Sequence, residues 1–220
     1  MANYEVEPSL LDEYVPAGTT LDLYKGKCFV SLVGFMFTDT RVLGFLIPFH
    51  INFEEVNLRL YVRRTLESEV RRAVTFIREI VPLPVVSLIA RVAYGEPYET
   101  WDMKNTRGDD RIEYELSKGS VKNRLGLSVG KNLGVPPSDS VEHFLIEHYW
   151  GYTRRGETRT DEYLVEHPPW ALSAVSEAEI NVDFGCIYGE KFAFLTGSTP
   201  YSVLFTRGSE IVVYQGKPIR

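Results

Sequence analysis

The chain has 220 residues, a formal net charge of −6 and a pI near 5.4, with 44% hydrophobic and 25% charged residues. This composition is typical of a globular protein and excludes an intrinsically disordered chain. The acidic balance argues against a dedicated nucleic-acid binder, because phosphate contacts need a basic face.

The sequence also lacks the patterns of a membrane or secreted protein. Its longest apolar run, Val81 to Ala90, contains two prolines and is shorter than the roughly 20 residues of a membrane span. Glu5 and Glu7 stand where a signal peptide has basic residues. The two cysteines, Cys28 and Cys186, lie far apart among apolar neighbours, which predicts buried free thiols. We therefore expect a cytoplasmic protein with no membrane partner, folded as a single domain over residues 1–220.

Short runs of β-branched and aromatic residues, separated by turn residues, predict a strand-rich fold. Lys25-Gly26, Arg107 to Asp110 and Arg207-Gly208-Ser209 have the composition of hairpin turns. In chain order the expected strands are Leu21 to Tyr24, Cys28 to Thr38, Phe53 to Val62, Tyr98 to Asn105, Arg111 to Ser117, Val121 to Gly130, Trp150 to Thr153, Thr160 to Glu166, Ala178 to Phe184, Tyr201 to Thr206 and Glu210 to Tyr214.

Two helices interrupt these strands. The first is expected from about Pro84 to Ala93, with proline at its start and Gly95 near its end. For the second, Asp139 is the expected cap and Glu142 completes a capping box. The stretch from Arg63 to Ile80 fits both a helix and a strand, and periodicity alone does not decide between them.

The strand Phe53 to Val62 alternates strictly, so that one face is apolar and the other is polar. A polar face of this kind is either solvated, as antiparallel sheets commonly allow, or it lines a concave pocket in a curved sheet. The polar face consists of Glu55, Asn57, Arg59 and Tyr61.

The pair Arg78-Glu79 precedes an apolar, proline-containing segment. Buried there, each charge would need a partner, so the pair is either a structural ion pair or part of a pocket wall.

The histidines His50, His143, His148 and His167 do not have the spacing of a metal site. We therefore expect neither a metal nor a cofactor. His148 beside Tyr149 is expected to be a half-buried imidazole. His167-Pro168-Pro169-Trp170 holds an imidazole and an indole in fixed relation and is expected to form a structural corner.

Three stretches, taken together, resemble the uncharacterised YqjF-like family. They are Phe53 to Val62, Phe144-Leu145-Ile146-Glu147-His148-Tyr149, and His167-Pro168-Pro169-Trp170, with Leu21 to Gly26 ahead of them. The resemblance spans nearly the whole chain. One departure is His148, where the family more often has arginine.

That family looks like a branch of the acetoacetate-decarboxylase-like superfamily. The resemblance implies an α+β fold in which a predominantly antiparallel, curved sheet closes toward a barrel around a central cavity, with about two helices. The decarboxylase pattern has Arg-Glu, four residues, proline and then two lysines, whereas Val85 and Val86 replace the lysines here. Because the lysine forms the Schiff base, this chemistry is disfavoured unless Lys104 or Lys122 reaches the cavity.

These features lead to three hypotheses of different classes. The first is a barrel that binds a small carboxylate or carbonyl compound, with Arg59 and Arg78 binding its oxygens and Glu55 or Glu79 as the candidate catalytic residue. The second is a non-catalytic sensor with the same cavity. The third is a structural module that self-associates through the polar strand face. The candidate ligand-binding residues are Asn57, Arg59, Tyr61, Arg78, His148, Tyr149, His167 and Trp170.

Overall fold

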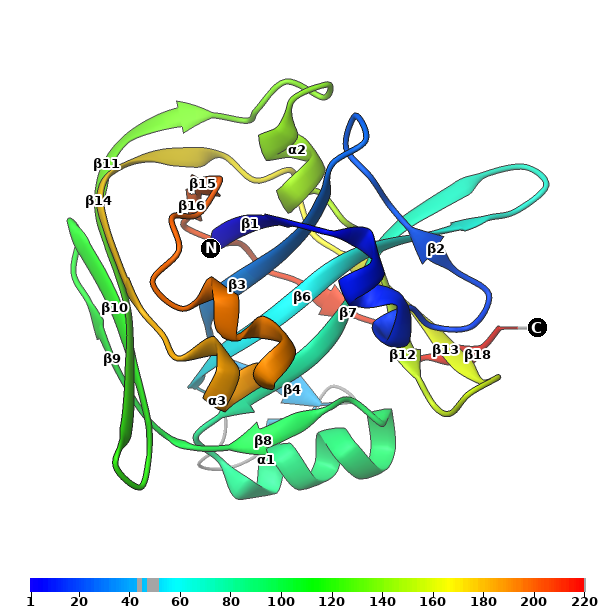
Figure 1. Cartoon of the computed structure of the whole chain (residues 1–220), viewed down its shortest axis with the longest axis horizontal. Coiled ribbons are helices and arrows are strands. Elements are labelled where there is room, and N and C mark those ends of the chain that lie inside the picture. The colour runs from blue at the N-terminus through cyan, green and yellow to red at the C-terminus, as the bar shows by residue number, and fades with distance from the viewer. Residues whose placement is uncertain (43–44, 47–51, 220) are drawn as a thin grey trace.

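The computed structural model describes residues 1–42, 45–46 and 52–219 and consists mainly of two β-sheets (Figure 1). The larger sheet has eleven strands. Its main path runs β15 (Ser202–Val203), β1 (Ala2–Val6), β3 (Cys28–Phe37), β6 (Phe53–Thr65), β7 (Val70–Val81), β12 (Trp150–Arg154), β13 (Thr160–Glu166) and β17 (Val212–Val213). At its margins β2 (Thr20–Leu21) pairs with β6, β8 (Tyr98–Thr100) with β7, and β18 (Lys217–Pro218) with β13.

The smaller sheet curves along one side of the larger one (Figure 1). Its order is β16 (Phe205–Thr206), β14 (Leu172–Asn181), β11 (Val121–Gly134), β10 (Arg111–Lys118) and β9 (Asp102–Arg107). A separate pair is formed by β4 (Arg41–Val42) and β5 (Phe45–Leu46). The helices are α1 (Pro84–Ile89) with a π-helical extension (Ala90–Tyr94), α2 (Val141–Ile146), α3 (Phe184–Tyr188) and the 3-10 helices Pro8–Tyr14 and Glu190–Leu195.

The larger sheet buries different side chains on its two faces. Leu58, Leu60 and their neighbours on β1 and β3 pack against the smaller sheet and α3 in the main core. The opposite face contributes Phe29 and Tyr61 to a second cluster beneath α2. Because side chains alternate along a strand, Glu55, Asn57 and Arg59 belong to this second face together with Tyr61.

The edge of β7 is the feature that shapes the candidate site. β12 runs parallel to β7 and pairs with it only at Ala73 and Val74. β8 is also parallel and pairs with β7 from Glu79 to Val81. Between these two pairings the edge of β7 is bordered by a cavity of about 220 Å³, which Thr75, Phe76 and Ile77 help to line.

The predicted α+β, predominantly antiparallel fold is confirmed, with two differences. The parallel pairings of β7 make the larger sheet mixed, and across the described ranges the strand order does not return on itself to close a ring. The undecided stretch from Arg63 to Ile80 contains the end of β6 and most of β7, because packing on both faces favours a strand. The single-domain assignment stays a prediction.

Most expected strands are confirmed within a few residues, and Thr160 to Glu166 coincides with β13. The turn at Lys25-Gly26 is also confirmed, since both residues have positive φ and Tyr24 pairs with Lys27. The hairpin at Arg207-Gly208-Ser209 is wrong, because β16 and β17, on either side of it, pair with different strands.

The two expected helices are present, with corrections at their ends. Gly95 ends the first in the left-handed region, at φ 67°. The second is capped by Ser140, whose hydroxyl accepts from the His143 amide, and not by Asp139. The strand expected to reach Phe184 stops at Asn181, because Asp183 caps α3.

The two thiols differ in exposure. Cys28 is a buried free thiol, as predicted. Cys186 is free but exposed, because it lies on the outer side of α3. Among the described residues, no helix is long and apolar enough to cross a membrane.

Candidate functional site

Two glutamates meet on the second face of the larger sheet. Glu55 lies on β6 two residues before Asn57, and Asn57 is in register with Glu79 on β7. Both carboxyl groups are buried, with exposed fractions of 1% for Glu55 and 3% for Glu79. Asn57 donates to one oxygen of Glu55 (2.8 Å), and the Tyr98 hydroxyl donates to the other (2.7 Å). Tyr98 reaches this point because β8 pairs with β7 opposite Glu79.

A third buried carboxyl group, that of Glu96, extends the cluster toward the cavity. Glu96 follows the end of the π-helical turn, and its carboxylate accepts a hydrogen bond from the Thr153 hydroxyl of β12. Tyr163 of β13 donates a second bond to it. We call Glu55, Glu79 and Glu96 the carboxyl cluster.

Burial raises the pKa of each member of the carboxyl cluster. It raises the pKa of Glu55 to about 7 and that of Glu96 to about 7. Burial also raises the pKa of Glu79 well above its ordinary value, and the negative charges of Glu55 and Glu96 raise it further. The cluster therefore holds protons near neutral pH, and its carboxyl groups can both donate and accept them.

One atom of the cluster has no hydrogen-bond partner in the described part of the chain. This atom is Oε2 of Glu79, and Oδ1 of the neighbouring Asn57 shares the property. Buried polar atoms without partners are uncommon in folded proteins. A donor from a bound water molecule or a ligand would complete the hydrogen bonding of these two atoms.

Farther along the same face, Arg59, Tyr61 and His148 form a second polar group. Arg59 Nη2 donates to the carbonyl oxygen of Leu145 (2.9 Å), and the Tyr61 hydroxyl donates to the same oxygen (3.1 Å). The His148 ring lies 5.0 Å from that of Tyr61. Burial, with the positive charges of Arg59 and Arg72, lowers the pKa of His148 well below its ordinary value. His148 is therefore neutral at pH 7.

The network around Tyr61 gives a first testable prediction. Its hydroxyl also lies 2.6 Å from the Ser31 hydroxyl, which bonds in turn to Asn3. Because Arg59 keeps its bond to Leu145, Tyr61→Phe should lower the free energy of unfolding by only about 1 kcal/mol in urea titrations. A loss of several kcal/mol would show that this hydroxyl holds the network together.

The structure does not bring Arg78 to the carboxyl cluster. Arg78 and Glu79 are neighbours on one strand and therefore project from opposite faces. Arg78 donates to the carbonyl oxygen of Ile187 in α3 and pairs with Glu99 at 3.3 Å. Arg59 and Arg78 thus lie on different faces of the sheet and do not come together, and their roles in ligand binding stay a prediction.

Tyr149, His167 and Trp170 come together at a corner of their own. The His167 ring stacks on Tyr149 (4.7 Å, 17°) and on Trp170 (4.1 Å, 18°). Glu147 accepts hydrogen bonds from the Tyr149 hydroxyl and the Trp170 amide. His167 also contacts the carbonyl oxygen of His148 (3.3 Å), and the Trp170 ring donates to the Ser209 hydroxyl (2.8 Å). None of these contacts reaches Glu55, Glu79 or Glu96. His50 lies outside the described residues.

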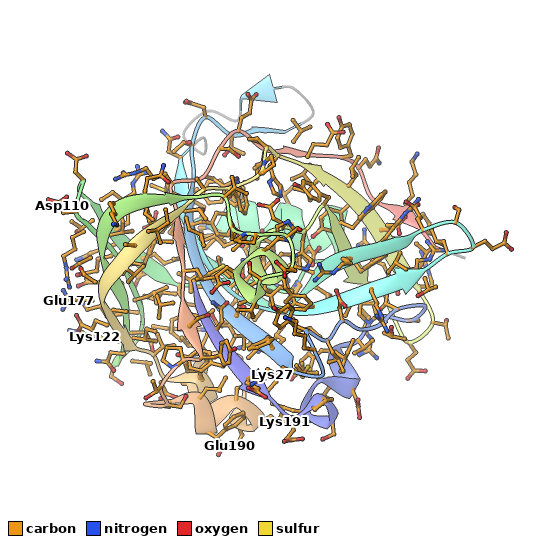
Figure 2. All side chains as sticks on the ribbon, turned by 90° about the horizontal axis from the view of Figure 1, so that it is seen from above. Lys27, Asp110, Lys122, Glu177, Glu190 and Lys191 are labelled. Atoms are coloured by element: carbon orange, nitrogen blue, oxygen red, sulfur yellow. The ribbon has the colours of Figure 1, made fainter. Side chains whose placement is uncertain are left out.

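All eight lysines lie in the described part of the chain, and none is buried. Lys104 and Lys122 are exposed on the smaller sheet, and Lys122 appears at the periphery of the molecule in Figure 2. Neither lysine takes the place of the missing pair. Within the described residues, no group of His, Cys, Asp or Glu side chains is arranged to hold a metal ion.

Sequence analysis missed four residues of the site. Glu96 lies 41 positions from Glu55 and 17 from Glu79, and the strands that bring in Thr153 and Tyr163 come later still. Only the pairing of β8 and β12 with β7 unites them, and no local pattern encodes that pairing. The missed residues are Glu96, Tyr98, Thr153 and Tyr163.

Comparison with solved structures identifies the fold class of this chain. Acetoacetate decarboxylase from Legionella pneumophila matches with a TM-score of 0.62 and 12% identity, covering 100% of this chain and 83% of that one. The enduracididine biosynthesis enzyme MppR, complexed with the condensation product of pyruvate and imidazole 4-carboxaldehyde, matches with a TM-score of 0.62 and 14% identity, over 99% and 85%. The chain thus has an acetoacetate-decarboxylase-like fold.

Sequence comparison identifies the family to which the chain belongs. Residues 1–210 match DUF2071, a family described as an uncharacterized conserved protein. The uncharacterized protein YqjF of Bacillus subtilis is 30% identical over 187 residues, which cover 83% of this chain and 74% of YqjF. The chain belongs to the DUF2071 family, and the resemblance to the YqjF-like family is confirmed.

Proposed function

We propose that the protein binds a small carbonyl compound and moves a proton on it through Glu55 and Glu79. The observation that carries this proposal is the buried contact of the two carboxyl groups, with the pKa of Glu55 raised to about 7 by burial. Because burial raises the pKa of both groups, the pair keeps a proton near pH 7, so that one group can act as an acid and the other as a base. The acid would donate to the carbonyl oxygen while the base removes a proton from the adjacent carbon.

The proposed reaction does not pass through a Schiff base. Val85 and Val86 lie in α1, where the decarboxylase pattern has its lysines, and the eight lysines of this chain are not buried. Acid–base chemistry at a carbonyl needs no covalent intermediate, and carboxyl groups with raised pKa values suit it. MppR, a neighbour in fold, has been seen with pyruvate, which supports a 2-oxo acid or related ketone as the first class to test.

A non-catalytic sensor is the second candidate, and one observation favours it. Both oxygens of Glu55 already accept hydrogen bonds from Asn57 and Tyr98, and Arg59 already donates to Leu145. Side chains held in place in this way suit reversible binding without turnover. Burial speaks against the third hypothesis, self-association through the polar face of β6, because Glu55 and Tyr61 are each 1% exposed within a single chain.

The test follows proton exchange, which requires no knowledge of the final product. Pyruvate, 2-oxobutyrate and the neutral ketone butanone are incubated with the protein in D2O, and loss of the proton next to the carbonyl is followed by NMR. We expect exchange at least tenfold above buffer, abolished in Glu79→Gln and kept in Glu177→Gln, an exposed carboxylate on the far sheet (Figure 2).

Binding is measured in parallel by thermal shift, since a ligand of the folded state raises Tm. Binding without exchange would support the sensor. Neither binding nor exchange with the three probes would contradict a carbonyl-compound site. We propose a cytoplasmic location and no nucleic-acid partner on the grounds of composition given above.

A further inference from the structure

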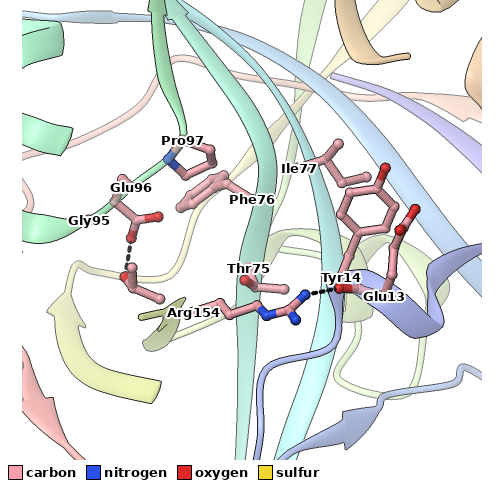
Figure 3. Close-up of a pocket in the computed structure, with 10 residues that line it drawn as sticks. Glu13, Tyr14, Thr75, Phe76, Ile77, Gly95, Glu96, Pro97 and Arg154 are labelled. Carbon is pink, nitrogen blue, oxygen red and sulfur yellow. Dashed lines mark hydrogen bonds between the residues drawn. The ribbon is translucent and has the colours of Figure 1, made fainter. Parts of the chain in front are cut away.

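The cavity beside β7 has one buried charged side chain in its wall. Its lining includes Glu96, Thr153 and Phe76 on the side of the carboxyl cluster, and Tyr14 and Ile77 on the side of the main core. Figure 3 shows Glu96 and Tyr14 on opposite sides of the pocket. Glu96 is 8% exposed and is held in place by Thr153 and Tyr163. The cavity thus combines a fixed carboxyl group with largely apolar walls.

The two charged groups at the rim of the cavity, Arg154 and Glu13, already have hydrogen-bond partners. Arg154 donates to the backbone carbonyl groups of Glu13 and Gly156. The Glu13 carboxylate bonds the Lys191 ammonium at 2.6 Å. The rim therefore contributes one charge of each sign, and the buried wall contributes only that of Glu96.

The groups around Glu96 leave its charge undercompensated. Behind it lie the other two carboxyl groups of the cluster, Glu55 and Glu79, and the hydroxyl of Tyr98. The positive charge of Arg155, which pairs with Asp161 at 2.7 Å, also acts on Glu96 and lowers its pKa, but burial outweighs this effect. A buried carboxylate needs a cation or a proton, and the cavity is the side from which a cation can approach.

From this geometry we propose that the cavity is a binding site for a small organic ammonium group, bound by the Glu96 carboxylate between the aromatic walls of Phe76 and Tyr14. The rings attract a cation through their π faces, and the carboxylate supplies a charge-assisted hydrogen bond. The volume of about 220 Å³ suits a ligand smaller than a drug molecule. This site stands whether or not Glu55 and Glu79 move protons.

The test compares three probes of similar shape on the wild-type chain: benzylamine, benzyl alcohol and phenylacetate. Titration calorimetry at pH 7 should give an affinity for benzylamine at least tenfold above those for the other two. It should also detect proton release, because an ammonium next to Glu96 lowers the fraction of that group that is protonated. Glu96→Gln should lose at least tenfold in affinity for benzylamine, whereas Glu177→Gln should keep it within twofold.

The three titrations of the wild-type chain test the proposed ammonium site even if Glu96→Gln does not fold. Equal affinity for benzyl alcohol would show an apolar cleft only. Tightest binding of phenylacetate would show that Arg154 governs the site, and absence of benzylamine binding would remove the site altogether. Each of these results overturns the proposal while leaving the deuterium-exchange result on Glu55 and Glu79 unaffected.

Discussion

Glu79→Gln should make the protein more stable at pH 8 than the wild type, while leaving its stability near pH 4.5 almost unchanged. Gln is neutral at every pH and has the shape of the protonated acid. Oε2 of Glu79 accepts no hydrogen bond in the described structure, so an amide there displaces no donor. At pH 8 the wild type must either carry a buried negative charge at Glu79 or keep Glu79 protonated at a pH at which an exposed carboxyl group is ionised. Both alternatives cost free energy. We expect a gain of at least about 1 kcal/mol at pH 8 from urea titrations.

The wild type should itself lose stability as the pH rises. Burial raises the pKa of Glu55 and of Glu96 to about 7, above the value near 4.5 expected when unfolded. The folded state then binds more protons than the unfolded state, so its stability is fully present below pH 4.5 and falls up to about pH 7. Each group contributes on the order of 3 kcal/mol to this fall. A flat profile from pH 5 to 8, or destabilisation by Glu79→Gln at pH 8, would contradict the raised pKa values.

Gly151→Ala should destabilise the protein by about 3 kcal/mol, because the ring of Tyr163 occupies the space that a Cβ atom would need. A Cβ atom at Gly151 would lie 2.1 Å from Cζ of Tyr163. The ring would have to move, and with it the hydroxyl that donates to Glu96. The free energy of unfolding, measured by urea titration, gives the size of this loss.

Gly156 provides the matched control, since a Cβ atom there meets nothing within 4 Å. Gly156→Ala should change the free energy of unfolding by less than about 0.5 kcal/mol. Tyr163→Ala should remove most of the additional cost of Gly151→Ala, as is usual for residues in contact. Additive losses in the double variant would show that the ring does not crowd this glycine.

Local patterns in the sequence were sufficient for the strands and for part of the site. The alternation of Phe53 to Val62 gave the faces of β6 correctly, and the polar face with Glu55 is buried. The face of Arg78 could not be assigned while the stretch around it fitted both a helix and a strand. Because the stretch is a strand, the side chains of Arg78 and Glu79 project from opposite faces of the sheet. The position of Glu96 depends on the pairing of β8 and β12 with β7, and these strands are far apart in the sequence. Local periodicity carries no information about such pairings.

Because the pairing between β12 and β7 is short, hydrogen bonds to the carboxyl cluster help to hold β12 and β13 in place. Only two residue pairs join these strands. Side-chain contacts must therefore provide most of the interactions that hold the hairpin of β12 and β13 against the sheet. Two of the bonds that do so, from Thr153 and Tyr163, end on Glu96. Strands β17 and β18 are attached in turn to β13. Removal of the Glu96 side chain would therefore weaken the attachment of this hairpin and of the two C-terminal strands that pair with it.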